Sequence, residues 1–228
     1  MSDRTDRKVI KMNKQDILNH IDHTQLKPYA TWDDIVNLCD DAILYKTASV
    51  CVPPSYIKRI HDTYGDEVNI CTVIGFPLGY SITEAKITET EKAIEDGANE
   101  IDVVVNISDV KNGLYGKVEE EIREIKKACG THILKVIIET CYLNEEEKIA
   151  MCKAVTNAKA DYIKTSTGFG TGGATIEDIR LFKEHIGPDV KIKAAGGIST
   201  LEDVEAFLGE GCDRIGTSRA VELLKGVE

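Results

Sequence analysis

Two lysines near the ends of consecutive apolar segments are the residues of this sequence with the clearest chemical potential. Lys164 lies in the segment 161–168, DYIKTSTG, and Lys193 lies in the segment 191–200, KIKAAGGIST. Two ammonium groups held close together inside a protein cannot both stay charged at low cost. A neutral lysine amine attacks an aldehyde or ketone to form an imine, which then draws electrons from a breaking carbon–carbon bond. Lys164 is therefore a candidate nucleophile for Schiff-base chemistry.

A carboxylate is expected beside these lysines. Along the segment 100–106, EIDVVVN, the residues alternate so that Asp102 shares one face with Val104 and Asn106, opposite Ile101 and Val103. An inward-facing Asp102 can hold the charge of the remaining ammonium group and relay protons. The structural alternatives are a buried acid that is paired for stability and lysines that reach solvent from the strand ends. The combination of two lysines with one acid favours the catalytic interpretation.

Glycines and hydroxyl residues after the last two predicted strands indicate an anion site. Gly196 and Gly197 follow the second lysine segment, and Gly216 and Ser218 open the last helix. Backbone amides freed by glycine, hydroxyl groups and two helix N-termini would form a phosphate cradle, in the usual place for an α/β barrel. Gly168, where the flexible turn GFGTGG is expected to begin, is assigned to the same site.

The rest of the chain repeats one unit that could position these residues. Short apolar runs alternate with glycine or polar turns and with amphipathic stretches, as in a βα array. Strands are predicted at 21–24, 48–52, 69–74, 100–105, 134–138, 162–165, 191–194 and 214–216. Helices are predicted at 32–45, 83–96, 118–129 and 145–156, with N-caps at Thr175 and Thr200.

The polar positions within these strands decide between a closed barrel and an open, doubly wound sheet. Both folds alternate strands and helices, but only a barrel has an interior that can receive polar side chains from successive strands. Strand alternation places several such side chains inward, namely Asp22, Thr24, Ser49, Cys51, Glu139, Lys164 and Lys193. We therefore predict an α/β fold, a single (β/α)₈ TIM-barrel domain over residues 13–228, after a loose tail at 1–12.

Composition narrows the possible functions. The chain has 228 residues, enough for one barrel domain, and its formal net charge of −11 argues against a general nucleic-acid binder. No signal-peptide core or membrane-spanning run is found in the sequence. The seven cysteines form no CxxC pair, and the five histidines show no metal-ligand spacing. These features predict a cytoplasmic protein that uses no metal and binds neither nucleic acid nor membrane.

At the level of whole motifs, the sequence resembles the bacterial deoxyribose-phosphate aldolases from residue 21 to its end. The motifs that carry the resemblance are IDHTQLKP (21–28), EIDVVVN (100–106), KVIIET (135–140), DYIKTSTG, KAAGG and RIGTS. The resemblance implies reversible cleavage of 2-deoxy-D-ribose 5-phosphate to acetaldehyde and D-glyceraldehyde 3-phosphate, without metal or organic cofactor. It also implies that Lys164 forms the Schiff base, with Asp102 and Lys193 as proton donor and acceptor.

The same resemblance assigns further residues to the substrate. Positions near the substrate hydroxyls or the proton relay are Asp22, Thr24, Cys51 and Thr167. Some members of the family carry a lysine after the STG turn, where this chain has Phe169, so here the phosphate is expected to depend more on the glycine loops and Ser218. We expect the protein to act on small molecules as a homo-oligomer, specifically a homodimer.

Two other functions are compatible with these residues. A barrel aldolase or transaldolase for another sugar phosphate would share the lysine, the carboxylate and the phosphate loops. Release of acetaldehyde would distinguish it from the expected enzyme. A non-catalytic barrel that binds a sugar phosphate would tolerate Lys164 without imine chemistry, and failure to trap an imine would favour it.

Overall fold

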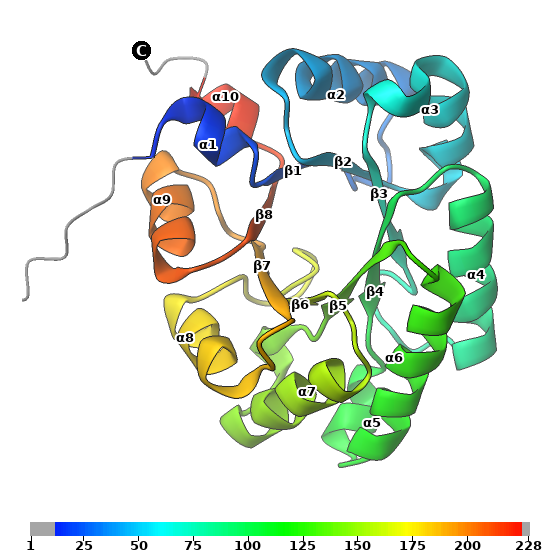
Figure 1. The fold of residues 1–228 in the computed structure, drawn as a ribbon, viewed down its shortest axis with the longest axis vertical. Coiled ribbons are helices and arrows are strands. Elements are labelled where there is room, and N and C mark those ends of the chain that lie inside the picture. The colour runs from blue at the N-terminus through cyan, green and yellow to red at the C-terminus, as the bar shows by residue number, and fades with distance from the viewer. Residues whose placement is uncertain (1–11, 225–228) are drawn as a thin grey trace, which may run out of the picture.

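Eight parallel strands close into a barrel in the computed structural model, which describes residues 12–224 (Figure 1). Each strand pairs with the next along the chain, and β8 pairs with β1. The strands are β1 (Ile21–Thr24), β2 (Ser49–Val52), β3 (Ile70–Ile74), β4 (Glu100–Val104), β5 (Ile133–Ile137), β6 (Tyr162–Lys164), β7 (Lys191–Ala195) and β8 (Arg214–Thr217). The predicted (β/α)₈ barrel is confirmed.

Helices surround the barrel on its outside (Figure 1). The α-helices are α1 (Lys14–Leu18), α2 (Trp32–Tyr45), α3 (Ile57–Tyr64), α4 (Thr83–Glu95), α5 (Ile107–Lys111), α6 (Tyr115–Cys129), α7 (Glu145–Asn157), α8 (Ile176–His185), α9 (Leu201–Glu210) and α10 (Ala220–Leu224). Short 3₁₀ helices are η1 (Pro54–Tyr56), η2 (Gly65–Glu67) and η3 (Thr140–Tyr142). The four helices predicted from periodicity are present, with ends that differ by three residues or fewer.

Side-chain caps fix where several helices begin. In α2, α7 and α9 the N-cap side chain accepts a hydrogen bond from the backbone N–H of N3, and the N3 carboxylate accepts one from the N-cap N–H. The three N-caps are Thr31, Asn144 and Thr200. Thr175 caps α8 by accepting from the N–H of Asp178 at 3.1 Å. The predicted N-caps Thr175 and Thr200 are confirmed, and such caps satisfy backbone donors that the first helical turn leaves free.

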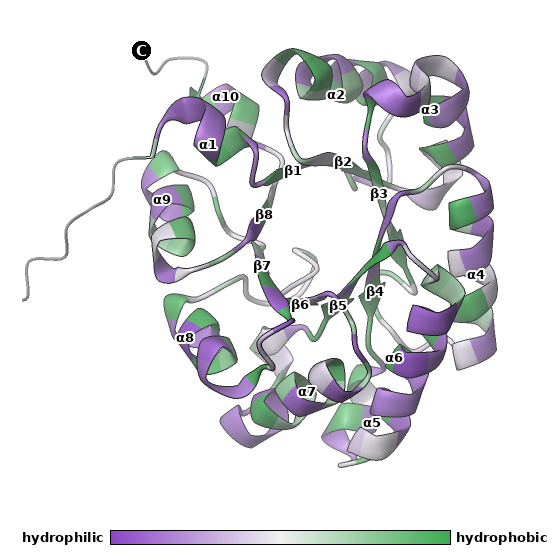
Figure 2. Cartoon of the chain, viewed as in Figure 1, coloured by the Kyte–Doolittle hydropathy of each residue, from purple (hydrophilic) through white to green (hydrophobic). Residues whose placement is uncertain are grey.

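The hydrophobic core lies between the outer face of the barrel and the helices. Ile101 and Val103 of β4 belong to this core and are at most 1% exposed, whereas Asp102 between them points into the barrel, toward Lys164. Figure 2 shows hydrophilic residues within the strands as well as on the helices. The period of two along each strand therefore separates an apolar exterior from a polar interior, as strand alternation predicts.

Two residues leave the strand faces on which they were expected. β5 ends at Ile137, and Glu139 follows in a left-handed backbone conformation with φ 52°, so its expected place on a strand is wrong. β4 ends at Val104, and Asn106 instead caps α5, where its side chain accepts from the N–H of Asp109. Both corrections arise because the strands end where the loops at the mouth of the barrel begin.

Several predictions concern the start of the chain and its location in the cell. The predicted loose tail, residues 1–12, lies outside the described residues except for Met12, which packs partly buried against the core. Between residues 12 and 224, no helix combines the length and the apolar character needed to cross a bilayer. The seven cysteines all lie in this part of the chain and are free thiols. The cytoplasmic location stays a prediction.

Gly79 offers a test of how closely the loops pack on the strand that carries Asp102. Its φ is +72°, and a Cβ atom there would lie 2.0 Å from the carbonyl oxygen of Val105. Gly113 has a similar φ of +70° but open space around it. We expect Gly113→Ala to lower the free energy of unfolding by about 1 kcal/mol through backbone strain. Gly79→Ala should cost about 1–3 kcal/mol more through overpacking, measured by urea denaturation. Equal losses in the two variants would contradict this close packing.

Candidate active site

Lys164 and Lys193 lie side by side on the inner face of the barrel. They are partners in the parallel pairing of β6 with β7, and both side chains are buried. Both amines bind one carboxylate oxygen, Oδ2 of Asp102, at 2.7 Å from Lys164 Nζ and 2.6 Å from Lys193 Nζ. The three residues that the sequence predicts as catalytic are therefore in direct contact.

The other carboxylate oxygen of Asp102, Oδ1, also has two partners. Lys135 Nζ, from β5, lies 2.9 Å from Oδ1, and the Sγ of Cys71, from β3, lies 3.2 Å from the same atom. Burial acts to raise the pKa of Asp102, but Lys135, Lys164 and Lys193 outweigh it and hold the pKa well below its usual range. Asp102 is thus an ionised carboxylate at neutral pH, although no solvent reaches it.

Lys193 is the more strongly paired of the two lysines. Its amine contacts both Asp102 and Asp22, the latter from β1, whereas Lys164 forms an ion pair with Asp102 alone among the described residues. Burial acts to lower the pKa of Lys193, but Asp102 and Asp22 outweigh burial and raise the pKa above its usual value. Lys193 is therefore the lysine that stays an ammonium group.

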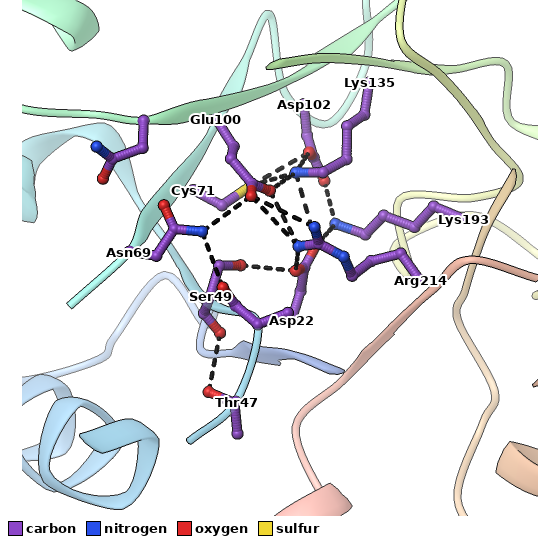
Figure 3. A network of polar contacts seen from close by, with 12 residues as sticks. Asp22, Thr47, Ser49, Asn69, Cys71, Glu100, Asp102, Lys135, Lys193 and Arg214 are labelled. Carbon is purple, nitrogen blue, oxygen red and sulfur yellow. Dashed lines mark hydrogen bonds and ion pairs between the residues drawn. The ribbon is translucent and has the colours of Figure 1, made fainter. Parts of the chain in front are cut away.

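The ion-pair network continues toward the N-terminal ends of the strands (Figure 3). Asp22 Oδ1 accepts hydrogen bonds from Ser49 Oγ at 2.6 Å and from the guanidinium of Arg214. The same guanidinium lies 3.1 Å from Glu100 Oε2, and Asn69 donates to Glu100 Oε1 at 2.9 Å. Because Glu100 and Arg214 are the first residues of β4 and β8, this part of the network lies at the end of the barrel away from the active-site loops.

A cavity of about 300 Å³ opens at the opposite, C-terminal end of the strands. Lys164 reaches this cavity, and all five predicted phosphate residues line it: Gly168, Gly196, Gly197, Gly216 and Ser218. Two larger grooves lie between α3 and α4 and between α6 and α7, and none of the predicted site residues lines them. The cavity at the strand ends is therefore the candidate substrate site, as is usual for this fold.

Glycine is required where two of these loops meet. Gly196 and Gly197 have φ values of 82° and 76°, in the left-handed region that favours glycine. Gly173 packs against this turn so closely that a Cβ atom there would lie 2.2 Å from the carbonyl oxygen of Gly196. Gly173, the last residue of the segment 168–173 that is expected to be a flexible turn, packs against the loop that follows β7.

The expected helix N-termini do not form the cradle. Thr200, the N-cap of α9, does not line the cavity, and its own side chain and that of Asp203 satisfy the first turn. The last helix, α10, begins at Ala220, beyond Ser218. The cavity walls come from the glycine loops, so a bound anion would meet loop amides and the Ser218 hydroxyl.

The residues predicted to bind substrate divide into two groups. Thr24 and Thr167 line the cavity, and the N–H and hydroxyl of Thr167 donate to the buried carboxylate of Glu139. Cys51 and Asp22 are buried and do not line the cavity. Asp22 is therefore placed to act on substrate only through Lys193.

Sequence reasoning missed four charged residues of the site. Strand alternation, the signal that placed Asp102 inward, also places Glu100 on the same face and would place Lys135 there, four residues before Glu139. Arg214 is the first residue of the motif RIGTS, and no spacing pattern marks it as part of the site. Lys27, from the loop after β1, is exposed and lines the same cavity as Ser218 and Gly216, and no periodicity marks it.

Two groups of potential metal ligands occur among the described residues. Their ligand atoms lie within 4.8 Å of one another in Cys51, Cys71 and Asp102 and in Asp22, Cys71 and Glu100. The carboxylates in both groups are already paired with lysine or arginine. A divalent cation would have to displace or face these positive charges, so the donor sets do not suit a metal.

Comparisons with known proteins agree on one family. The sequence profile described as DeoC/LacD family aldolase matches residues 16–217. The chain is 72% identical over 217 residues to the deoxyribose-phosphate aldolase of Clostridium botulinum (strain Alaska E43 / Type E3), covering 95% of this chain and 98% of that protein. It is 57% identical over 209 residues to the protein of the same name from Clostridioides difficile (strain 630), covering 92% and 95%.

Solved structures give the same relationship. The structure titled "QR15, an Aldolase" superposes with a TM-score of 0.88 at 39% identity, covering 92% of this chain and 95% of that one. The tetrameric deoxyribose phosphate aldolase from Aeropyrum pernix superposes with a TM-score of 0.87 at 33% identity, covering 93% and 91%.

The buried carboxylates predict how stability depends on pH. Burial acts to raise the pKa of Asp22, but Lys193, Lys135 and Arg214 outweigh it and lower the pKa below its usual range. A lowered carboxylate pKa contributes stability above the unfolded-state value, about 4, and loses it as pH falls further. We expect Asp22→Asn to cost about 3–5 kcal/mol at pH 7 because it leaves buried cations underpaired.

The free energy of unfolding of Asp22→Asn should also fall less steeply below pH 4 than that of wild type. Urea denaturation between pH 3 and pH 7 measures both effects. Asp189→Asn removes an exposed carboxylate and is the control that should change neither. An unchanged pH slope in Asp22→Asn would show that Asp22 does not contribute in this way.

Proposed function

The chain belongs to the DeoC/LacD family of aldolases, and from this premise we propose that it cleaves 2-deoxy-D-ribose 5-phosphate reversibly. The proposed products are acetaldehyde and D-glyceraldehyde 3-phosphate, formed through a Schiff base on Lys164. The names of the curated relatives support the substrate, and the chemistry of the barrel interior supports the mechanism.

One observation carries the proposed mechanism. The amines of Lys164 and Lys193 bind the same oxygen of Asp102, and Lys164 alone of the three lines the cavity. An ammonium at Lys193, held by its carboxylates, disfavours a second ammonium beside it. Lys164 is therefore the proposed nucleophile, since its amine is the one that lines the substrate site.

The proposed reaction begins with attack of the Lys164 amine on C1 of the open-chain sugar. A proton supplied by the network of Asp102 and Lys193 lets the C1 hydroxyl leave as water and gives a protonated imine. The carboxylate of Asp102 stabilises the positive charge of this imine in a site from which solvent is excluded. Because the sugar aldehyde is neutral, this step places a cation where the free amine had none. The positive nitrogen then acts as the electron sink for the next step.

Cleavage between C2 and C3 follows. A base in the network of Asp102 and Lys193, acting through a water molecule, removes the proton of the C3 hydroxyl, and the electrons of the C2–C3 bond flow into the imine to give an enamine. Glyceraldehyde 3-phosphate leaves. The enamine is protonated at carbon, and hydrolysis of the imine releases acetaldehyde and restores the amine of Lys164.

The phosphate is proposed to bind at the loops after β7 and β8. Gly196, Gly197, Gly216 and Ser218 line the wall of the cavity, and Lys27 reaches the same cavity from the loop after β1. The lysine amine supplies a positive charge, whereas the loop amides and the serine hydroxyl supply directional hydrogen bonds. This arrangement binds a phosphate without a lysine at position 169.

Substrate choice, cofactor use and oligomeric state are also proposed. An aldolase for another sugar phosphate would use the same lysine, carboxylate and loops, and only product analysis separates the two. The residues supply nucleophile, carboxylate and ammonium groups for the whole cycle, so no cofactor is proposed. A homo-oligomer is proposed, since the Aeropyrum pernix relative is tetrameric.

Trapping the imine tests the proposed function directly. Borohydride added with acetaldehyde should attach an ethyl group to Lys164 and abolish activity, because a reduced imine cannot hydrolyse. Mass spectrometry of proteolytic peptides locates the label. Labelling found mainly on Lys193 would reverse the assigned roles, and no label at any pH would favour a barrel that only binds a sugar phosphate. Release of a product other than acetaldehyde would favour another aldolase.

A charge placed in the phosphate site tests the substrate assignment. Ser218→Asp should raise KM for 2-deoxyribose 5-phosphate by about tenfold or more, because a carboxylate there repels the phosphate. KM for unphosphorylated 2-deoxyribose should change little, and steady-state kinetics with both sugars measure the difference. Ser218→Asn, which adds similar bulk without charge, is the matched control. Equal losses on both sugars with Ser218→Asp would place the phosphate elsewhere.

A further inference from the structure

The buried network beneath Lys164 contains more basic groups than acidic ones. Within residues 12–224, ion pairs connect three carboxylates to four basic groups. The carboxylates are Asp22, Glu100 and Asp102, and the basic groups are Lys135, Lys164, Lys193 and Arg214. The six Asp, Glu and Lys side chains are at most 3% exposed, and that of Arg214 is 11% exposed. One positive charge is therefore in excess if every group is ionised.

Three of the four basic groups each contact at least two carboxylates. Arg214 lies between Asp22 and Glu100. Lys135 contacts Glu100 at 2.5 Å and Asp102 at 2.9 Å. The amine of Lys193 contacts both Asp22 and Asp102.

Lys164 contacts fewer carboxylates than the other three basic groups of the network. Its ion pair is with one atom, Asp102 Oδ2, which Lys193 also contacts. Arg214, in contrast, has two carboxylate partners. Burial acts to lower the pKa of Arg214, as it does for Lys193, but Asp22 and Glu100 outweigh burial and raise that pKa. The lysine with the fewest partners is thus also the one that opens on the cavity.

We propose that Arg214 is a positioning residue for Lys164, because by pairing with Asp22 and Glu100 it leaves Lys164 as the basic group in excess of the three carboxylates. This inference rests on the proposed Schiff-base function. Arg214 does not line the cavity, and it begins β8 at the other end of the barrel. It therefore acts through the charge balance of the network and not through contact with substrate.

The physical basis is the cost of net charge where water is excluded. With Lys164 neutral, the three carboxylates balance Lys135, Lys193 and Arg214, and the network has no net charge. Protonation of Lys164 gives it one net positive charge, which a buried site disfavours. If Arg214 were uncharged, protonation of Lys164 would restore neutrality, so Lys164 would hold its proton to higher pH.

The thiols of Cys71 and Cys51 also lie beside this network, and their charge states affect its net charge. Burial and a hydrogen bond with Cys51 raise the pKa of Cys71 well above its usual value, so Cys71 is a neutral thiol. The hydrogen bond from Cys71 lowers the pKa of Cys51. A thiolate at Cys51 would add a fourth anion, so the measurements below are made both in the natural sequence and in a Cys51→Ala background.

The remaining neighbours do not change the balance. Ser49 and Asn69 are uncharged donors to Asp22 and Glu100. The ring of Tyr162, on β6, lies 5.7 Å from the guanidinium carbon of Arg214. Glu139, in the loop after β5, hydrogen-bonds to Thr167 and forms no ion pair with the network within residues 12–224.

The test is the pH dependence of imine formation at Lys164 in full-length protein. Acetaldehyde with cyanoborohydride traps the imine, and mass spectrometry measures the rate of labelling at Lys164 from pH 5 to pH 10. Arg214→Gln should move the midpoint of this profile up by about one pH unit, because the network has lost a positive charge. Glu100→Gln should move it down by a similar amount, and the double variant should return it to the wild-type position.

Opposite shifts distinguish this role from a structural one. Damage to the fold would lower the labelling rate in both single variants without moving the two midpoints in opposite directions, and that outcome would overturn the proposal. Arg214→Lys, which keeps the charge, should keep the wild-type midpoint, and thermal unfolding checks that each variant is folded. Shifts that vanish in the Cys51→Ala background would assign the balance to the thiolate instead and would also overturn it.

The same experiment separates this inference from the proposed function. If wild-type protein shows no label on Lys164 at any pH, the Schiff-base function itself fails. If wild type is labelled but the Arg214 and Glu100 variants keep its midpoint, only the role of Arg214 is wrong.

Discussion

Oxygen Oδ2 of Asp102 accepts hydrogen bonds from the amines of Lys164 and Lys193 in a region that solvent does not reach. Two cations and one anion cannot be balanced there, and the excess charge is costly because the surroundings screen it poorly. The barrel meets this constraint by holding Lys193 with a second carboxylate, Asp22, and leaving Lys164 with a shared contact. The reactive amine of the proposed mechanism is thus the one with fewer carboxylate partners.

Closure of the sheet makes such a network possible. In a barrel of eight parallel strands, inward side chains from all strands meet around one axis, so β1, β4, β6 and β7 each contribute one of these four residues. The register fixes their heights, and Lys164 is paired directly with Lys193. An apolar outer face on the same strands provides the hydrophobic core that holds the register. The polar interior therefore depends on the packing of the opposite face of each strand.

The two ends of the barrel serve different purposes. Loops at the C-terminal ends of the strands form the cavity, where glycines with positive φ expose backbone amides. At the N-terminal ends, Glu100, Arg214 and Asn69 complete the network with ion pairs and hydrogen bonds, and these residues do not line the cavity. Substrate recognition and the charge state of the interior can consequently be set by different residues. The residues of the cavity loops can vary at one end of the barrel while the balance of charges in the network is kept at the other end.

The barrel fold and the positions of the main site residues could be predicted from the sequence. Strand alternation, a local property with a period of two, predicted the barrel and placed Asp102, Lys164 and Lys193 inside it. Glycines after the last strands predicted the wall of the cavity. The tertiary structure alone decided which atoms share a charge: Arg214 meets Asp22 across 192 positions of sequence, and local patterns carry no information on such pairing. It also decided where the strands end: Glu139 follows β5 in a left-handed conformation, and its carboxylate accepts a hydrogen bond from Thr167, which follows the next strand.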